Sequence, residues 1–393
     1  MRHLAITILG LLGMAAAQQQ PRRTFGEAVP HSMPKVMYQG CTDPAKIHSK
    51  EQFYRCEDAY LDGLIAKWQD QAKPGPKLVF SGNAQVLHAM AIARYPVETL
   101  KIFVTAMKES GAGRIDINPS PLAWIKPLPD TIAKYDAAIA EIRRQGMQIS
   151  FNPTTFPGFD PPVSYQEWQK ESARMYAELA RRYKPEVFSV MHEPWSMDRR
   201  LGEHVTPQQW REFVDAAVRL VKKESPNTKC VASFLPEPDV EQEVVKSPAL
   251  DGVGLDIYHQ FDEFQTFDRM IKIAKDAGKY VYIAETGRPM ITFRDGILDF
   301  DAVLSIPDPL LQKLEPKWME AMALYAITRG LEGVAEFWTA PFFAYDANTE
   351  DPRSKEYTEV VEKGMLSGAR TPTFYAFQAL AAKYGKLPAA AAR

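Results

Sequence analysis

The sequence has 393 residues, 46% of them hydrophobic, so it can bury a large core, and this length suits an α/β barrel with insertions. The formal net charge of −2 and the pI of about 6.4 exclude a strongly basic surface of the kind that binds nucleic acid. No glycine-rich phosphate-binding motif is present. An uncharged or weakly charged partner therefore fits best.

The first 17 residues have the three-part layout of a secretory signal peptide. Arg2 and His3 give a weakly positive start, residues 4–14 are apolar, and residues 15–17 are the small side chains of a cleavage site. The apolar run is too short to span a bilayer. We therefore expect a secreted or periplasmic protein with no membrane span.

The chain contains three cysteines. In an exported protein Cys41 and Cys56 could form a disulfide worth roughly 3 kcal/mol in the chain-entropy model, although their spacing is also compatible with two free thiols. Cys230 lies in an apolar run and is expected to be a small buried residue. No spacing among the three indicates a metal site.

Residues 18–76 form an N-terminal extension that is rich in proline and polar residues up to residue 48. Ser49 and Gln52 have the spacing of a capping box, which predicts a helix to about Lys67. The extension ends in a proline- and glycine-containing breaker, and the first strand after it is either residues 77–80 or residues 85–93.

From there to residue 393, segments with strand and helix patterns alternate. The predicted strands after the first begin at Arg114, Met147, Val187, Lys229, Gly252, Tyr280 and Gly333. Eight strand–helix units predict a parallel sheet closed into a (β/α)8 barrel, so residues 77–393 are expected to form one catalytic domain.

The active site of such a barrel lies at the carboxyl ends of its strands. The polar and aromatic residues expected at those ends are Asn118, Asn152, His192, Glu193, Glu237, Tyr258, His259, Glu285 and Trp338. Glu193 and Glu285 each follow an apolar strand, three strands apart. Two carboxyl groups at about 5–5.5 Å are what double-displacement hydrolysis of a glycoside requires, one as the acid/base and one as the nucleophile.

The remaining residues have expected supporting roles. An inward Arg114 would keep Glu285 ionised, and Tyr258 would donate a hydrogen bond to the same carboxylate. Glu237 is expected on the rim, and Glu336, inside the eighth strand, is expected to pair with an inward arginine rather than to act in catalysis. Asp116 and Asp256, both in mid-strand, are expected to be structural hydrogen-bond acceptors.

These motifs resemble those of the clan A retaining glycoside hydrolases, the (β/α)8 group that contains cellulases, mannanases, xylanases and β-galactosidases. In that clan the acid/base stands in Asn-Glu-Pro and the nucleophile in Glu-Thr-Gly or Glu-Phe-Gly, which Glu193-Pro194 and Glu285-Thr286-Gly287 match. The resemblance covers residues 77–385 and implies hydrolysis without a cofactor.

The same resemblance gives roles to residues around the two carboxylates. Arg114 resembles the second-strand arginine, Tyr258 the sixth-strand tyrosine, and Trp338 the eighth-strand tryptophan that lies under the sugar. His192 stands where the clan usually has an asparagine, and a mannanase-containing branch of the clan also has a histidine there. His192 could instead be a strand-end histidine that is hydrogen-bonded to a backbone carbonyl.

Three loops after the strands contain aromatic residues, which either line a cleft for an oligo- or polysaccharide or hold the loops on the barrel. They are Phe156, Phe159, Tyr165, Phe293, Phe300, Phe342, Phe343 and Tyr345.

Two other functions remain open. A metal-dependent sugar isomerase or epimerase-like barrel could use Glu193, Asp256, His259 and Glu285 as ligands of a hard divalent ion. A catalytically inactive barrel that binds carbohydrate is the third possibility.

Overall fold

The structure is a computed structural model, and the barrel belongs to a unit that spans Ser32–Arg393. It describes residues 41, 50–72, 78–87, 92, 94–119, 129–153, 164–201, 203–258, 264–287, 292–294, 297–299, 311–337, 339–344 and 355–386. The predicted signal peptide, His259 and Trp338 lie outside the described residues.

Eight parallel strands form a closed barrel in the order β1-β10-β7-β6-β5-β4-β3-β2, as the alternating pattern predicted. The strands are β1 Val79–Asn83, β2 Arg114–Ile117, β3 Gln148–Phe151, β4 Val187–His192, β5 Lys229–Phe234, β6 Gly252–Tyr258, β7 Tyr280–Gly287 and β10 Gly333–Glu336. Two further short strands, β8 Thr292–Arg294 and β9 Ile297–Asp299, pair antiparallel in the connection after β7.

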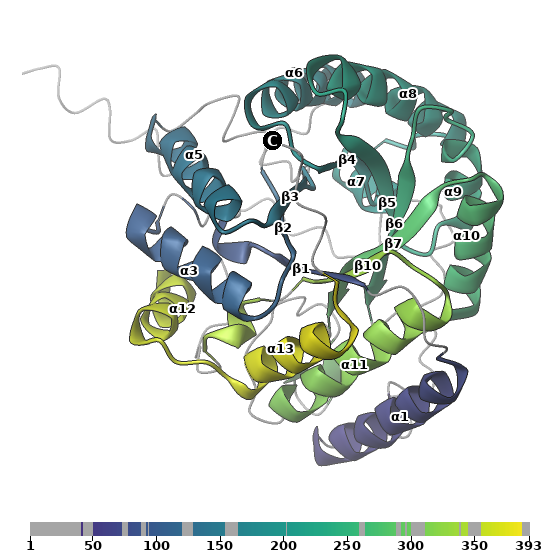
Figure 1. The fold of residues 1–393 in the computed structure, drawn as a ribbon. Helices are drawn as coiled ribbons and strands as arrows, with labels where there is room; N and C mark the ends of the chain where they lie inside the picture. The colour runs from purple at the N-terminus through teal and green to yellow at the C-terminus, as the bar shows by residue number, and fades with distance from the viewer. Residues whose placement is uncertain are drawn as a thin grey trace, which may run out of the picture. The chain divides into compact units, whose positions relative to one another are not determined.

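Helices surround the strands (Figure 1). They are α1 Lys50–Gln71, α3 Val97–Glu109, α5 Pro129–Arg144, α6 Tyr165–Tyr183, α7 Pro194–Leu201, α8 Pro207–Glu224, α9 Pro238–Val244, α10 Phe264–Asp276, α11 Leu311–Thr328, α12 Lys355–Ser367 and α13 Pro372–Tyr384. The capping boxes at Ser164 and Thr206 satisfy the amide groups of these N-cap residues and of the third residue of α6 and of α8. No helix in the described part of the chain is both long and apolar enough to cross a membrane.

The structure decides between the two candidates for the first strand. Val79–Asn83 is β1, which overlaps residues 77–80, whereas Gln85–Leu87 is a turn of 3-10 helix. β1 pairs with β10 on one side and β2 on the other, so it closes the barrel.

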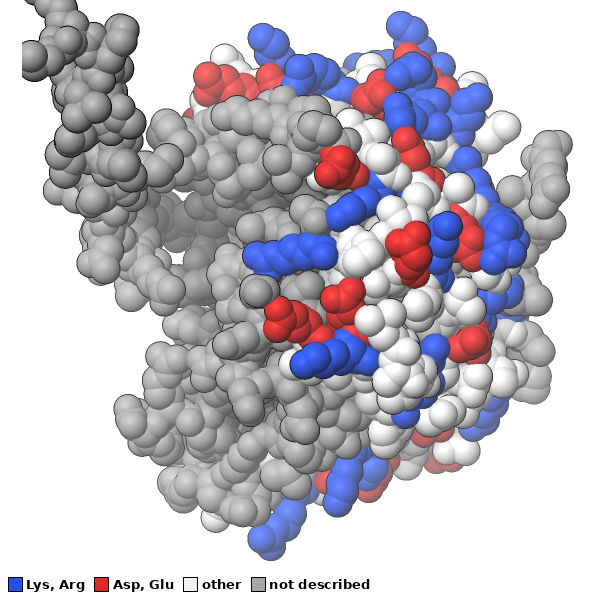
Figure 2. All heavy atoms as spheres, turned by 90° about the vertical axis from the view of Figure 1, so that its left-hand side faces the viewer, with Lys and Arg blue, Asp and Glu red and all other residues white. Residues whose placement is uncertain are grey.

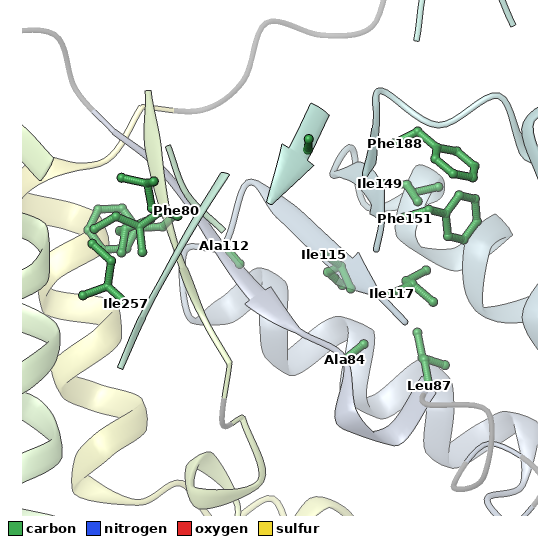
Figure 3. Close-up of a cluster of buried hydrophobic side chains, with 14 of the residues drawn as sticks. Phe80, Ala84, Leu87, Ala112, Ile115, Ile117, Ile149, Phe151, Phe188 and Ile257 are labelled. Carbon is green, nitrogen blue, oxygen red and sulfur yellow. The ribbon is translucent and has the colours of Figure 1, made fainter. Parts of the chain in front are cut away.

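The core lies mainly between the strands and the helices. Residues of β2 and β3 alternate, so that Ile115, Ile117, Ile149 and Phe151 pack outward, all fully buried, and Figure 3 shows part of this layer. The other face of each strand points into the barrel, where the polar residues of the site are found.

The extension is cross-linked to its own helix. Cys41 and Cys56 form a disulfide, which settles a pairing that the sequence left open, and α1 packs along α11. Cys230 is buried in β5 with a free thiol, as expected, and burial raises the pKa of this thiol to about 12.

The outer side of the barrel that carries α3 and α5 shows basic and acidic side chains interspersed (Figure 2). A cavity of about 480 Å³ lies on this outer surface, where Arg144 pairs with Glu141 and Arg370 with Glu109. None of its lining residues belongs to the predicted site.

Candidate active site

The two strands that carry the predicted carboxylates are both bulged. In β4, Ser189 and Met191 face the consecutive residues Val231 and Ala232 of β5. One extra residue in a strand reverses the in-and-out alternation beyond it, and such bulges often re-aim a side chain beside an active site.

In β7 the extra residue stands directly before the predicted nucleophile. Ile283 and Glu285 face the consecutive residues Leu255 and Asp256 of β6, and the pairing of β7 with β10 shifts in the same place. Tyr282 already faces the barrel interior, where it lies over Arg114, so strict alternation would have turned Glu285 outward. The bulge lets both side chains face inward.

Two neutral donors hold the carboxylate of Glu285. Asn152 Nδ2 donates to Oε1 at 2.9 Å, and Tyr258 Oη donates to Oε2 at 2.5 Å. Glu285 is 3% exposed, and burial raises its pKa well above the ordinary value, with a further contribution from the charge of Glu193. The two hydrogen bonds act in the opposite direction because they stabilise the ionised form.

Glu193 lies at the turn between β4 and α7. Its backbone has a φ of 42°, in the left-handed region that residues other than glycine rarely adopt. Its N–H donates to the carbonyl of Ser233 at 3.0 Å, and its own carbonyl accepts from the N–H of Met197 at 3.0 Å. This second bond makes Glu193 the N-cap residue of α7.

His192 lies between the two carboxylates. Its Nε2 is 3.9 Å from Glu193 Oε2 and 3.8 Å from Glu285 Oε1. Its Nδ1 is 2.9 Å from Ser233 Oγ and 3.2 Å from Asn152 Nδ2. Because one nitrogen is near both oxygens, the predicted acid/base and nucleophile are brought into one site.

Asp256 also belongs to this cluster. It stands opposite Glu285 in the register of β6 and β7, is fully buried, and has Oδ2 3.7 Å from Nδ1 of His192. Burial, and then the charge of Glu285, raise its pKa well above the ordinary value. His192, Glu193 and Asp256 each offer one ligand atom within 4.8 Å of the others, so these three residues are the ones that could hold a metal ion in the described part of the site.

Arg114 lies at the opposite end of β2 from the predicted site. Its Nη2 donates to Ser81 Oγ at 3.3 Å, its Nε is 3.5 Å from Asp116 Oδ1, and its guanidinium lies 5.1 Å from the ring centroid of Tyr282. Its contacts in the described residues do not include Glu285. Asn152 occupies the position beside Glu285 that was expected for this arginine.

Asn118 follows β2 at the expected end of the strand. Its Oδ1 accepts from Asn83 Nδ2 at 2.6 Å, and its own Nδ2 is buried without a hydrogen-bond partner among the described residues. A buried donor in this state is available to a ligand, because leaving it unpaired is costly.

Two residues with unexpected contacts complete the surroundings. Glu237, predicted on the rim, accepts a hydrogen bond from the N–H of Trp195 at 2.7 Å. Thr286, next to Glu285, donates to the carbonyl of Ile257 at 2.8 Å and accepts from Trp318 Nε1 at 2.9 Å. The sequence carried a signal only for Glu237, since a carboxylate between two prolines after β5 is at the active-site end of the barrel.

The aromatic residues predicted in the loops fall into two groups. Tyr165, Phe342 and Phe343 are buried and pack against neighbouring aromatic rings, so they hold their segments on the barrel. The other loop aromatics named above either lie outside the described residues or belong to side chains that are not described.

No protein-family model and no curated protein matches the sequence. Among solved structures, a GH10 endoxylanase from a sugarcane soil metagenome aligns at 13% identity over 79% of this chain and 98% of its own, with a TM-score of 0.47. The virulence factor SghA in complex with the substrate analogue salicin aligns at 12% over 83% and 99%, with a TM-score of 0.48. A β-galactosidase from Marinomonas ef1 aligns at 14% over 73% and 59%, with a TM-score of 0.47. Similarity at this level carries no information about the activity of this chain.

Proposed function

We propose that the protein is a retaining β-glycoside hydrolase that acts on an oligo- or polysaccharide. The observation that carries the proposal is the placement of Glu193 Oε2 and Glu285 Oε1 at 3.9 and 3.8 Å from the same nitrogen of His192. Two carboxyl groups so arranged at the carboxyl ends of barrel strands suit the two steps of double displacement.

In the first step Glu285 attacks the anomeric carbon while Glu193 gives its proton to the departing glycosidic oxygen. In the second step Glu193 takes a proton from water, the water oxygen replaces Glu285 on the anomeric carbon, and both carboxyl groups return to their initial states. Repulsion between the two groups favours a state with one shared proton. The donors Asn152 and Tyr258 favour the form in which Glu285 is the ionised partner.

The resemblance of Glu193-Pro194 and Glu285-Thr286-Gly287 to the clan A motifs supports the same roles. This chemistry needs no metal or cofactor. The N-terminal segment with signal-peptide layout, together with the disulfide between Cys41 and Cys56, supports a secreted or periplasmic location, because such bonds persist in oxidising compartments.

The test is azide rescue of two variants on an activated aryl β-glycoside. Glu285→Ala should lose activity and recover it with azide as an α-glycosyl azide, because azide then replaces the nucleophile. Glu193→Ala should instead form the β-glycosyl azide from the covalent intermediate. A fully active Glu285→Ala enzyme would contradict the proposal, and exchanged azide stereochemistry would exchange the two roles.

A second candidate is a metal-dependent sugar isomerase, which the ligand atoms of His192, Glu193 and Asp256 favour. Prolonged dialysis against a chelator separates the two functions. A hydrolase should keep its activity, whereas an isomerase should lose it and regain it when a divalent metal is restored.

A further inference from the structure

The N-terminus of α7 lacks the usual cap from its own N-cap residue. Glu193 occupies the N-cap position, and an N-cap side chain ordinarily accepts a hydrogen bond from the second or third amide of the helix. The carboxyl group of Glu193 instead lies beside His192, in the candidate site. Pro194 has no N–H, so the first amide group of α7 is that of Trp195, which needs an acceptor from outside the helix.

Glu237 supplies this acceptor from the connection after β5. Its Oε1 accepts from the N–H of Trp195 at 2.7 Å. Glu237 is itself the N-cap residue of α9, yet its side chain makes no capping bond to that helix. Glu237, the N-cap residue of α9, thus caps α7 with its carboxyl group in place of Glu193.

The backbone of Glu237 is fixed on both sides. Its N–H donates to the carbonyl of Leu235 at 2.6 Å, and its carbonyl accepts from the N–H of Glu241 at 3.0 Å. The residue as a whole is partly exposed, but its Oε2 is shielded from solvent. A carboxyl group held in this way can fix the start of α7 and, with it, the left-handed turn at Glu193.

The charge state of Glu237 is compatible with this role. Burial raises its pKa well above the ordinary value, the hydrogen bond from Trp195 opposes that rise, and the charge of Glu193 adds to it. A neutral carboxyl group still offers an acceptor oxygen to the amide of Trp195. It also adds no negative charge beside the proton donor, so an amide side chain should be able to replace it.

We propose that Glu237 is a positioning residue for Glu193: it caps α7 in its place and so leaves the carboxyl group of Glu193 free to act as the proton donor. This role rests on the proposed function of Glu193 as the acid/base.

The test compares kcat/KM for two β-glycosides of the same sugar, one with a 2,4-dinitrophenyl leaving group and one with an alkyl leaving group. The first departs without a proton, whereas the second needs general acid catalysis, which contributes about 10²–10⁴-fold. We expect Glu237→Ala to lower kcat/KM on the alkyl glycoside by about tenfold or more and to leave the value on the dinitrophenyl glycoside within about twofold.

Glu237→Gln, which keeps an acceptor oxygen for Trp195, should restore most of the activity on the alkyl glycoside. Asp239→Ala is the matched control, because this side chain on the first turn of α9 is 88% exposed, and it should change neither value. If Glu237→Ala does not fold, Glu237→Met, which keeps the side-chain length without the acceptor, takes its place.

The same assay on Glu193→Ala separates this inference from the proposed function. If Glu193→Ala changes kcat/KM by the same factor on both glycosides, Glu193 is not the acid and the proposed function fails. If Glu193→Ala shows the leaving-group difference but the Glu237 variants lower both values equally, or neither, the positioning role of Glu237 is overturned.

Discussion

Asn152 Nδ2 donates to Glu285 Oε1 at 2.9 Å, so the partner of this carboxylate on the β3 side is a neutral amide rather than the guanidinium of Arg114. With Tyr258 on the other oxygen, both side chains that donate hydrogen bonds to Glu285 within the described part of the chain are neutral groups. The ionisation of Glu285 therefore depends on these bonds, which oppose the effects of burial and of Glu193.

The first prediction concerns Tyr258→Phe. Removing the hydroxyl group removes an interaction that lowers the pKa of Glu285, so that pKa should rise and the nucleophile should ionise only at higher pH. The acidic limb of the profile of kcat/KM against pH should move upward, and kcat/KM below the optimum should fall about tenfold or more. The control is Tyr280→Phe, which removes a tyrosine hydroxyl group at the amino end of β7 and should leave the profile in place. An unmoved acidic limb in Tyr258→Phe would refute the role assigned to Tyr258.

The left-handed backbone at Glu193 predicts a difference in stability between two variants that lack its carboxylate. Glycine adopts a φ of 42° without steric cost, whereas alanine pays about 1–2 kcal/mol there, partly offset by the larger entropy of glycine in the unfolded chain. Glu193→Gly should therefore be more stable to urea than Glu193→Ala by about 1 kcal/mol. Both variants lack the carboxylate, so its charge cancels in the comparison. Equal stability would mean that this turn is unstrained.

The sequence predicted the barrel because each strand and helix has a strong local signal. The bounds of β5 and β6 were predicted to the residue, and the capping signals at Ser164 and Thr206 mark the starts of α6 and α8. β1 was ambiguous because its five residues include a glycine and an asparagine, which lower strand propensity.

The site was predicted less completely, because contacts inside a barrel depend on the level of each residue along its strand. Arg114 and Asn118 point the same way in an alternating pattern, but they are four residues apart, or about 13 Å along the strand. The alternation predicted the direction of the Arg114 side chain, but the level of Arg114 relative to Glu285 is set by how the strands are offset in the barrel. The bulges in β4 and β7 have no sequence signature here. The contact between Glu237 and Trp195 joins the connection before α9 to the first turn of α7, 42 residues away in the chain.

The thiol content of the protein tests the disulfide of the N-terminal extension. After unfolding without reductant, the chain should show one reactive thiol, that of Cys230, and three after reduction. Cys56→Ser should lower the free energy of unfolding by about 3 kcal/mol, as expected for a loop of this length. Three thiols before reduction in protein purified from an oxidising compartment would contradict the pairing.

Because of Glu241, we expect the free energy of unfolding to fall as the pH rises. It is buried in α9, its carboxyl oxygens have no hydrogen-bond partner among the described residues, and burial raises its pKa to about 9 from an ordinary 4.5. Between these two values the unfolded chain has released the proton that the folded chain still holds, so rising pH favours unfolding.

Glu241→Gln replaces this carboxyl group with an amide that does not titrate. The variant should therefore unfold at a higher temperature than the unmodified protein at pH 8. The difference should shrink toward pH 4.5. Glu243→Gln, a partly exposed neighbour that pairs with Arg211, is the control and should not show a gain that grows with pH. A constant difference between the Glu241 variant and the unmodified protein across this range would show that the group does not titrate as expected.

The last prediction concerns the hydrogen bonds that keep β7 in its bulged register. Thr286 donates to the carbonyl of Ile257 on β6 and accepts from Trp318 Nε1 on α11, and both bonds require Thr286 to face away from the barrel interior. A slip of one residue would turn Thr286 inward and Glu285 outward. These bonds therefore favour the register that keeps Glu285 in the site.

Thr286→Val keeps the shape of the side chain but removes both bonds, which should cost about 1–3 kcal/mol of stability and lower kcat more than it changes KM. Thr286→Ser should recover most of both losses, because it keeps the hydroxyl group. Thr328→Val, which removes a hydroxyl bonded to a backbone carbonyl at the end of α11, should reduce stability slightly and leave kcat unchanged. If Thr286→Val unfolds more easily but turns over substrate at the original rate, the two bonds stabilise the barrel without fixing the nucleophile.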